Sequence, residues 1–418
     1  MTSFAVKFLG CKVSQADAML ARSHLLVAGH EEAPEDDAEL HVINTCCITR
    51  EAEAKSRQSV RRSARDGHRV VVTGCAANLN ATQFDEIAES VTALVGTADD
   101  VAEQVAGTAG PACIDTNLDP LHGLAGARTR GFVKVQDGCD CHCAYCIIPS
   151  VRGGARSRPA TAVLREARRR AEQGQPEMVM TGISVGDYRD PERGIELGEL
   201  MREVAGLEGV ERVRLSSVEV IHVRDALLDA LADDERICPH LHVPLQSGDD
   251  SVLAAMGRHY DSTGYLGAIE RLRERVPHVN VTTDVIVGYP SEDERAFEHT
   301  LRVVRDAGIT KVHTFSFSPR PGTRADALGD PVPPDEKKRR SREMRGLSEA
   351  LGRRHRAGKL GSVEEVLVDK RAEAQASGYS RDYTRYYLPP DAGAPGSVVA
   401  VRAEELHADG VVGAMTGR

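Results

Sequence analysis

The sequence lacks the segments that direct a chain into or through a membrane. No stretch stays apolar long enough to cross a bilayer, and the start, Met1 to Lys7, holds no basic segment followed by a long apolar run. We therefore expect a cytoplasmic protein with no signal peptide and no membrane contact. In that reducing compartment, its 10 cysteines favour metal ligation over disulfide bonds.

An excess of positive charge is also missing. The formal net charge is −10 at pH 7, which argues against a protein that coats nucleic acid indiscriminately but leaves room for a local basic patch. The chain has 418 residues, of which 41% are hydrophobic and 28% charged. Such a composition is ordinary for a globular protein, and the length suits two or three domains with their own cores.

Cysteine is concentrated in one stretch, residues 138–146, directly after an apolar run at 132–135 that predicts a strand. Cys139, Cys143 and Cys146 form a C-x3-C-x2-C pattern, so three thiolates can converge on one soft metal centre. A closed iron–sulfur cluster usually has four cysteine ligands. Three ligands therefore leave one iron open for a substrate.

The first hundred residues repeat a strand, a turn and a helix, with predicted strands at 4–9, 40–43 and 70–72. This alternation predicts a parallel sheet whose turns lie together at its carboxyl edge. Each turn carries cysteine: Cys11, the pair Cys46 and Cys47, and Cys75. A single one would be explained more simply as a buried apolar thiol. Three at equivalent turns favour a second metal site, and spacing does not choose between Cys46 and Cys47.

Residues 106–129 are rich in Gly, Ala and Pro and suit a linker. After it, strand-like and helix-like segments alternate again. The predicted strands are residues 131–136, 177–181, 211–216, 239–244, 279–287 and 311–317. Six such units predict a partial (β/α)6 barrel of the TIM type, since a full eightfold barrel needs about 250 residues. Its active site is expected at the carboxyl ends of the strands, where the cysteine stretch lies.

Two features of the last eighty residues suit contact with RNA. Between Lys337 and Lys359 ten residues are basic and two acidic, which suits either a solvated helix face or a phosphate contact. Beyond residue 360, short β-like pieces predict a small OB-type barrel rich in tyrosine, where Tyr383 and Arg385 suit base stacking and core packing is the competing explanation. The candidate RNA contacts are Lys337, Lys338, Arg339, Arg340, Arg353, Arg354, Tyr383 and Arg385.

These motifs together resemble those of the radical S-adenosylmethionine (SAM) methylthiotransferases. The resemblance rests on Gly10-Cys11-Lys12-Val13, Asn44-Thr45-Cys46, Thr73-Gly74-Cys75, the run from Gly138 to Gly153, Arg156-Ser157-Arg158-Pro159, Pro244-Leu245-Gln246-Ser247-Gly248 and Pro319-Arg320-Pro321-Gly322-Thr323. It implies a flavodoxin-like N-terminal domain at 1–108, a linker at 109–128, a radical-SAM barrel at 129–345, a basic connecting helix at 346–359 and a TRAM RNA-binding domain at 360–418.

The resemblance also implies cofactors and ligands. One [4Fe–4S] cluster would be held by Cys139, Cys143 and Cys146 and would bind and cleave SAM; a second, which carries the sulfur, would be held by Cys11, Cys46 and Cys75. This pattern selects Cys46 over Cys47 and makes Cys141 a spacer, while Ser14 departs from the expected asparagine. The resemblance further implies two SAM molecules per turnover. The candidate SAM contacts are Thr181, Gly182, Ser217, Gln246, Ser247, Ile286 and Gly288.

Within the family, Gly-Cys-Lys-Val and Lys55-Ser56-Arg57-Gln58 resemble the branch that acts on N6-threonylcarbamoyladenosine at position 37 of tRNA. The expected partners are a tRNA anticodon stem-loop and an electron donor such as a flavodoxin or ferredoxin. The alternatives are isopentenyladenosine-37 or a ribosomal-protein aspartate as the substrate and, more distantly, a non-catalytic metal- and RNA-binding protein. The roles of Cys47, Cys113, Cys141 and Cys238 stay open.

Overall fold

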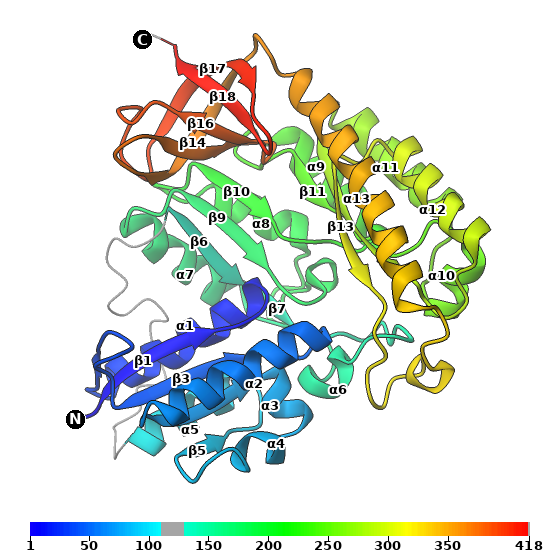
Figure 1. The fold of residues 1–418 in the computed structure, drawn as a ribbon. Helices are drawn as coiled ribbons and strands as arrows, with labels where there is room; N and C mark the ends of the chain where they lie inside the picture. Colours follow the sequence, from blue (N-terminus) through cyan, green and yellow to red (C-terminus); the bar gives the residue numbers. More distant parts are fainter. Residues whose placement is uncertain (110–128, 417–418) are drawn as a thin grey trace.

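The computed structural model describes residues 1–109 and 129–416, so Cys113 and nearly all of the predicted linker lie outside the described residues. Figure 1 shows an α/β N-terminal domain, a central barrel beside it and a small β-barrel at the opposite end. This architecture confirms the predicted fold class. In the described ranges no helix is long and apolar enough to cross a membrane.

The N-terminal domain is a parallel five-stranded sheet with the order β2-β1-β3-β4-β5. Its strands are β1 (Ser3–Phe8), β2 (Glu31–Glu32), β3 (Leu40–Thr45), β4 (Arg69–Gly74) and β5 (Val91–Ala93), and its helices are α1 (Lys12–Val27), α2 (Arg50–Arg65), α3 (Cys75–Leu79), α4 (Thr82–Asp85) and α5 (Ala98–Ala109). Side chains alternate across the sheet. Val42 and Val71 pack against α1 and α5, whereas Ile43 and Val72 pack towards α2 and α3.

The central domain holds six parallel strands in two sheets, β10-β9-β6 and β11-β12-β13, joined by a parallel bridge between Val213 and Ile237. The strands are β6 (Arg130–Lys134), β9 (Glu177–Thr181), β10 (Arg212–Leu215), β11 (His240–His242), β12 (Asn280–Val287) and β13 (Lys311–Ser316), while β7 (Gln136–Asp137) and β8 (Arg156–Ser157) form a separate antiparallel pair. All six predicted strands are therefore present, and they form the predicted open barrel.

Helices cover the outside of this barrel, and its largest apolar core lies between them and the strands. They are α6 (Ile148–Arg152), α7 (Ala160–Glu172), α8 (Leu197–Ala205), α9 (Asp225–Asp233), α10 (Asp250–Met256), α11 (Ser262–Arg275) and α12 (Glu294–Asp306), with short 3-10 turns η1 (Val185–Asp187), η2 (Val220–His222) and η3 (Asp326–Leu328). The sequence had not predicted α6 and α10.

A long helix, α13 (Pro334–Ala357), packs against β13 and α12. Met344 is fully buried, and the Ser348 hydroxyl accepts a hydrogen bond from the Val312 backbone N–H at 2.9 Å. The domain boundary expected at 345/346 falls in the middle of this continuous helix. The part of the basic segment that precedes residue 346 thus packs as part of the central domain.

The C-terminal domain is a closed five-stranded barrel with the order β14-β15-β16-β18-β17. Its strands are β14 (Val363–Arg371), β15 (Ala376–Ser380), β16 (Arg385–Leu388), β17 (Val398–Leu406) and β18 (Val411–Met415). The barrel docks on the amino ends of the central strands. Arg212 at the start of β10 donates to the carbonyls of Tyr379 and Glu365 at 3.1 and 2.9 Å, and Asn280 at the start of β12 donates to Asp382 O at 2.7 Å.

Candidate functional site

The three N-terminal cysteine turns meet at the carboxyl edge of the sheet. Cys11 follows β1, Cys46 follows β3 and Cys75 begins α3 directly after β4. Cys46 and Cys75 are buried, and Cys11 is exposed. Burial raises the pKa of Cys75 to about 11 and also raises that of Cys46, and in both cases the charge of Cys11 adds to the rise. The structure therefore brings this trio within electrostatic reach.

Two glycines allow these turns to approach so closely. Gly10 has φ +124°, and a Cβ on it would lie 2.9 Å from the Cβ of Cys46. Gly74 has φ +88°, and its Cβ would lie 2.6 Å from the carbonyl oxygen of Thr45. Because both backbone conformations and both contacts exclude a side chain, glycine is required before Cys11 and before Cys75.

Cys46 and Cys47 point to different surroundings. The backbone of Cys46 is held by Ser56, whose hydroxyl accepts from Cys46 N at 3.1 Å. Cys47 is fully buried in an apolar cluster with Val60 and Val72, and its thiol donates to the Cys75 carbonyl at 3.4 Å. Burial raises the pKa of Cys47 well above that of a free thiol. These contacts give Cys47 a packing position.

The central cysteines lie on one loop between β7 and α6. Gly138 has φ +71°, and a Cβ on it would lie 1.9 Å from Gly154 O, so the start and the end of the loop touch. Cys139 N donates to Gly153 O at 3.1 Å, and Cys146 N donates to Cys143 O at 3.1 Å. All three cysteines are half-buried.

Cys141 supports one of these ligands. Its thiol and its backbone N–H both donate to the sulfur of Cys139, the N–H at 3.4 Å, and these hydrogen bonds lower the pKa of Cys139. The same hydrogen bond raises the pKa of Cys141 itself. The backbone N–H of Cys141 is therefore a hydrogen-bond donor to the sulfur of a candidate ligand.

Arg258, which the sequence did not single out, contacts the central trio. Its Nη1 donates to the sulfur of Cys143 at 3.2 Å, its Nε donates to the Tyr260 hydroxyl at 3.1 Å, and it is ion-paired with Glu219. The side chain is 4% exposed. Arg258 follows the unpredicted helix α10, and a single arginine in a turn carries no sequence signal of this role.

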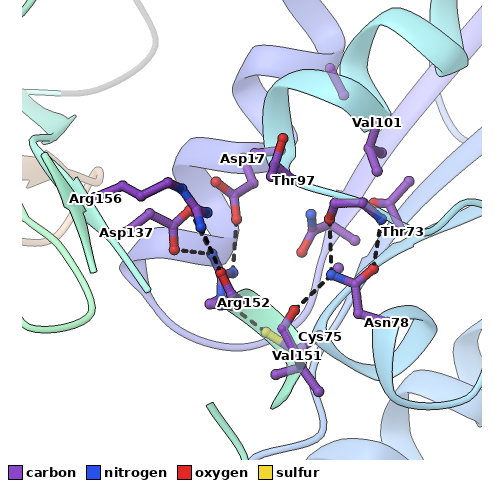
Figure 2. A pocket seen from close by; sticks show the side chains of 15 residues that line it. Asp17, Thr73, Cys75, Asn78, Thr97, Val101, Asp137, Val151, Arg152 and Arg156 are labelled. Carbon is purple, nitrogen blue, oxygen red and sulfur yellow. Dashed lines mark hydrogen bonds and ion pairs between the residues drawn. The ribbon is translucent and has the colours of Figure 1, made fainter. Parts of the chain in front are cut away.

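Arg152 makes the corresponding contact at the N-terminal trio. It ends α6, and its Nε donates to the sulfur of Cys75 at 3.1 Å. Its other nitrogens donate to Asp17 at 2.8 Å and to Asp137 at 2.9 Å, and Lys134 pairs with the same two carboxylates. Figure 2 shows Arg152 with Asp17, Asp137 and Cys75 on one side of a pocket between the two domains.

One apolar cluster lies behind both trios. It contains Cys75, Ala76 and Ala77 of α3 together with Ile148 and Val151 of α6. Cys139 and Cys146, on the other side, pack against it. The Asn78 amide also crosses the boundary and donates to Val151 O at 2.7 Å (Figure 2). The two cysteine sites are therefore neighbours across a packed domain interface.

The donor sets fit iron–sulfur clusters better than single ions. Among the described residues no three Cys, His, Asp or Glu side chains are close enough to hold one metal ion. A four-iron cluster binds each thiolate to a different iron, so its ligands stand farther apart. Each trio offers three soft sulfur donors, and in each trio an arginine N–H donates to one of the sulfurs. Such a donor set suits a four-iron cluster.

The candidate SAM contacts divide into two groups. Thr181, Gly182, Ser217, Gln246 and Ile286 lie at the carboxyl ends of β9, β10, β11 and β12, on the side of the central cysteines. The other two candidates, Ser247 and Gly288, lie against α12 and α13 instead.

Ser247 is fully buried, with its hydroxyl 3.4 Å from that of Thr300 on α12. A Cβ on Gly288 would lie 2.5 Å from the Lys337 side chain on α13. The Ser247 hydroxyl is thus occupied by helix packing and does not suit the SAM contact that the sequence suggested, whereas Gly288 could contact SAM only through its backbone.

The candidate RNA contacts on α13 also divide. Lys337 and Arg340 are buried and ion-paired, Lys337 with Asp330 and Arg340 with Glu292, so these two serve packing rather than RNA. Arg339 is bound to three carboxylates. The exposed positions with helical spacing on one face are Lys338, Arg342, Arg345 and Arg353, with Arg354 exposed nearby.

In the C-terminal barrel, Tyr383 lies in the domain interface. Its ring stacks on Tyr379 with 4.9 Å between centroids, the Arg214 guanidinium lies 4.6 Å from the ring centre, and its hydroxyl accepts from Arg130 at 3.0 Å. With Tyr379 and Arg214 against it, this ring is already engaged in contacts within the protein, which does not suit base stacking. Arg385 is 35% exposed and pairs with Asp409 at 2.9 Å, so it stays on the surface.

Comparison with known proteins agrees with this arrangement. Residues 133–304 match the Radical SAM superfamily, and residues 3–96 match Uncharacterized protein family UPF0004. A protein of Chlamydia pneumoniae named threonylcarbamoyladenosine tRNA methylthiotransferase MtaB is 34% identical, with 98% of this chain and 97% of that protein covered. A tRNA-2-methylthio-N(6)-dimethylallyladenosine synthase of Syntrophotalea carbinolica is 35% identical over 88% of this chain and 89% of its own length.

A solved structure shares the fold. The radical SAM methyltransferase TsrM of Kitasatospora setae, with cobalamin and a [4Fe-4S] cluster bound, superposes with a TM-score of 0.57 at 13% identity and covers 78% of this chain and 74% of its own. At that identity the likeness concerns the fold alone.

Proposed function

The chain belongs to the radical SAM methylthiotransferase family, and from that membership we propose that it inserts a methylthio group at C2 of N6-threonylcarbamoyladenosine-37 in tRNA. Methylthio transfer, SAM with a [4Fe-4S] cluster, and a tRNA substrate follow from the family. The nucleoside, the second cluster, two SAM per turnover and the electron donor are parts of the proposal. The juxtaposition of two cysteine trios across one apolar cluster carries it.

The residues of this chain have separate tasks in the proposal. Cys139, Cys143 and Cys146 hold one cluster, and Cys11, Cys46 and Cys75 hold the other. When bound, the clusters and SAM supply radical chemistry, which the non-acidic C2–H of adenine requires. The protein positions the groups. Arg258 fixes Cys143, and the apolar cluster behind both trios excludes water from that side of the site.

SAM is proposed to bind at the carboxyl ends of the central strands. Thr181, Gly182, Ser217, Gln246 and Ile286 surround that edge. Gln246 adopts φ +65° and joins two strand ends, because its N–H donates to Asp284 O at 2.8 Å and its carbonyl accepts from Ile286 N at 2.9 Å. Such a strained position at a strand end supports a binding role.

The tRNA is proposed to contact the exposed arginines of α13 and the outer face of the C-terminal barrel. Arg342, Arg345 and Arg353 have no carboxylate partner in the described part of the chain, so their charge is available to phosphates. Arg385 lies over the ring of Tyr387 at 4.6 Å and adds a basic, aromatic spot. These surfaces favour a nucleic acid over a protein aspartate as the substrate.

Nucleoside analysis of tRNA tests the substrate. In a strain that lacks this gene, mass spectrometry should show loss of the 2-methylthio derivative of threonylcarbamoyladenosine, with the unmodified nucleoside in its place. Loss of the 2-methylthio derivative of isopentenyladenosine instead would move the chain to the other tRNA branch, as the Syntrophotalea relative allows. An unchanged profile would refute the proposal.

A further inference from the structure

The sulfur of Cys75 is contacted by a residue of the other domain. Arg152 belongs to the central domain, six residues after Cys146, yet its Nε lies 3.1 Å from the Cys75 sulfur. Its two terminal nitrogens are bound to Asp17 of the N-terminal domain and Asp137 of the central domain. Figure 2 shows the guanidinium between these partners. Two of its three contacts, with Cys75 and Asp17, thus cross the domain boundary, and the third, with Asp137, stays within the central domain.

The surroundings keep Arg152 charged and in place. Its side chain is 7% exposed, and although burial alone would lower its pKa, Asp17 and the neighbouring groups raise it. Lys134 lies 2.6 Å from Asp17 and 3.3 Å from Asp137, so two cations and two carboxylates balance. With both carboxylates engaged, the Nε edge of Arg152 stays directed at the sulfur.

A second arginine of the central domain approaches the same site. Arg320, in the loop after β13, is 3% exposed, and its Nη1 donates to Glu53 of α2 at 2.9 Å. Its Nε and Nη2 are buried and have no hydrogen-bond partner among the described residues. Buried guanidinium N–H groups need an acceptor. Glu53, which Arg320 contacts, lies one turn before Ser56 on α2, and Ser56 holds the backbone of Cys46.

In the central site, the arginine that contacts the trio comes from the same domain as the cysteines. Arg258 and Glu219, which hold Cys143, belong to the same domain as that cysteine. The N-terminal trio differs, because both of its arginines come from elsewhere in the chain. We infer that the N-terminal site is completed by the central domain, with Arg152 positioning Cys75 and Arg320 donating to the anionic sulfur group held beside Cys46. This inference rests on the proposed function, which assigns a sulfur-carrying cluster to that trio.

The measurable consequence is the reduction potential of the N-terminal cluster. Positive charge and N–H donors near cluster sulfurs favour the reduced, more negative state. Removing either arginine should therefore move the midpoint potential to a more negative value. A residue that only packs the domains together would leave the potential of an assembled cluster unchanged.

The experiment uses the full-length chain with Cys139, Cys143 and Cys146 replaced by Ala, reconstituted anaerobically, so that one cluster gives the electron paramagnetic resonance signal. Arg152→Gln and Arg320→Gln should each retain about four irons and titrate at a more negative potential. Arg152→Lys and Arg320→Lys, which keep the charge, should recover part of the shift. Arg275→Gln, which removes an exposed ion pair with Asp229, is the control and should leave this potential unchanged.

The outcomes separate the inference from the proposed function. If both glutamine variants hold iron and titrate as the parent does, the inference is refuted while the cluster stands. If the parent holds no iron, the second cluster of the proposed function fails and the inference falls with it. If Arg152→Gln alone does not fold by circular dichroism, Arg320→Gln decides. Loss of iron in a folded glutamine variant, restored by lysine, also supports the inference.

Discussion

The two cysteine sites of this molecule have similar chemistry but are built in opposite ways. The central trio lies within eight residues on one loop, and that loop is closed by its own glycines and backbone hydrogen bonds. The N-terminal trio comes from three separate strand ends and exists only when the sheet is folded. One site is thus encoded locally and the other by tertiary structure, so they should respond differently to substitution.

The largest expected difference concerns the reaction that each site supports. Cys143→Ala should abolish both SAM cleavage and methylthiolation, whereas Cys75→Ala should abolish methylthiolation and leave SAM cleavage. Each variant should hold about four irons instead of about eight. Chromatography of 5′-deoxyadenosine and of tRNA nucleosides measures the two products. Equal loss of SAM cleavage in both variants would show that the sites do not have separate roles.

A smaller difference is expected in stability, because only the N-terminal site depends on an ion network between domains. Asp17→Asn leaves Arg152 and Lys134 short of a buried carboxylate and should lower the free energy of unfolding by about 3 kcal/mol. Glu203→Gln, which breaks the exposed pair of Glu203 with Arg193, should cost less than about 1 kcal/mol. Urea denaturation of the apoprotein compares them, and equal costs would contradict the role given to the network.

The same network predicts a dependence on pH. Burial alone would raise the pKa of Asp137, but the neighbouring Lys134 and Arg152 lower it overall. Its stabilising contribution is therefore present above the ordinary aspartate pKa of about 4 and is lost as the pH falls below that value. Thermal melts of the apoprotein should show an acid-induced loss that is smaller in Asp137→Asn. An identical loss in the variant would exclude Asp137 as a cause.

Substitutions on α13 should weaken tRNA binding without changing either cysteine site. Replacing Arg342, Arg345 and Arg353 by Gln should reduce the salt dependence of tRNA binding by about one unit for each phosphate that is no longer bound, without changing iron content. Arg339→Gln is the control, since its guanidinium is already bound to Glu336, Glu294 and Glu343. Filter binding at several salt concentrations gives the slope. A slope equal to that of the wild-type protein would show that these arginines of α13 do not contact the RNA.

The smallest effects are expected from the extra thiol in each site. Cys47→Ala removes a fully buried side chain and should cost about 1 kcal/mol of stability with product formation retained. Cys141→Ala keeps the backbone N–H that donates to Cys139 and should cost less. Iron content and tRNA nucleosides check both. Loss of iron in Cys47→Ala would make Cys47 a ligand and Cys46 the packing residue.

The contrast between the sites also explains what could be predicted from the sequence. Alternating segments predicted all six central strands, and the carboxyl-edge rule predicted that Cys11 and Cys75 would meet. Arg152 and Arg320 lie within the family motifs, but a motif does not show that their side chains reach the N-terminal domain, and Arg258 lies in a turn that carries no pattern.

Tyrosine and lysine misled for a related reason. Composition predicts that Tyr383 and Lys337 face RNA, but it does not reveal burial. The amino ends of the central strands cover Tyr383, and α13 turns Lys337 inward towards Asp330. Only the packing of whole elements decides which members of a charged or aromatic run reach the surface.

The C-terminal barrel docks on the amino ends of the central strands, whereas both cysteine trios lie beyond their carboxyl ends. At about 3.3 Å per residue, the eight residues of β12 alone separate these ends by roughly 26 Å. A free nucleoside is far shorter than that, so it could touch only one end. On the proposed function, the substrate must therefore be long and rigid enough to contact the C-terminal barrel while its reacting base lies at the cysteine sites.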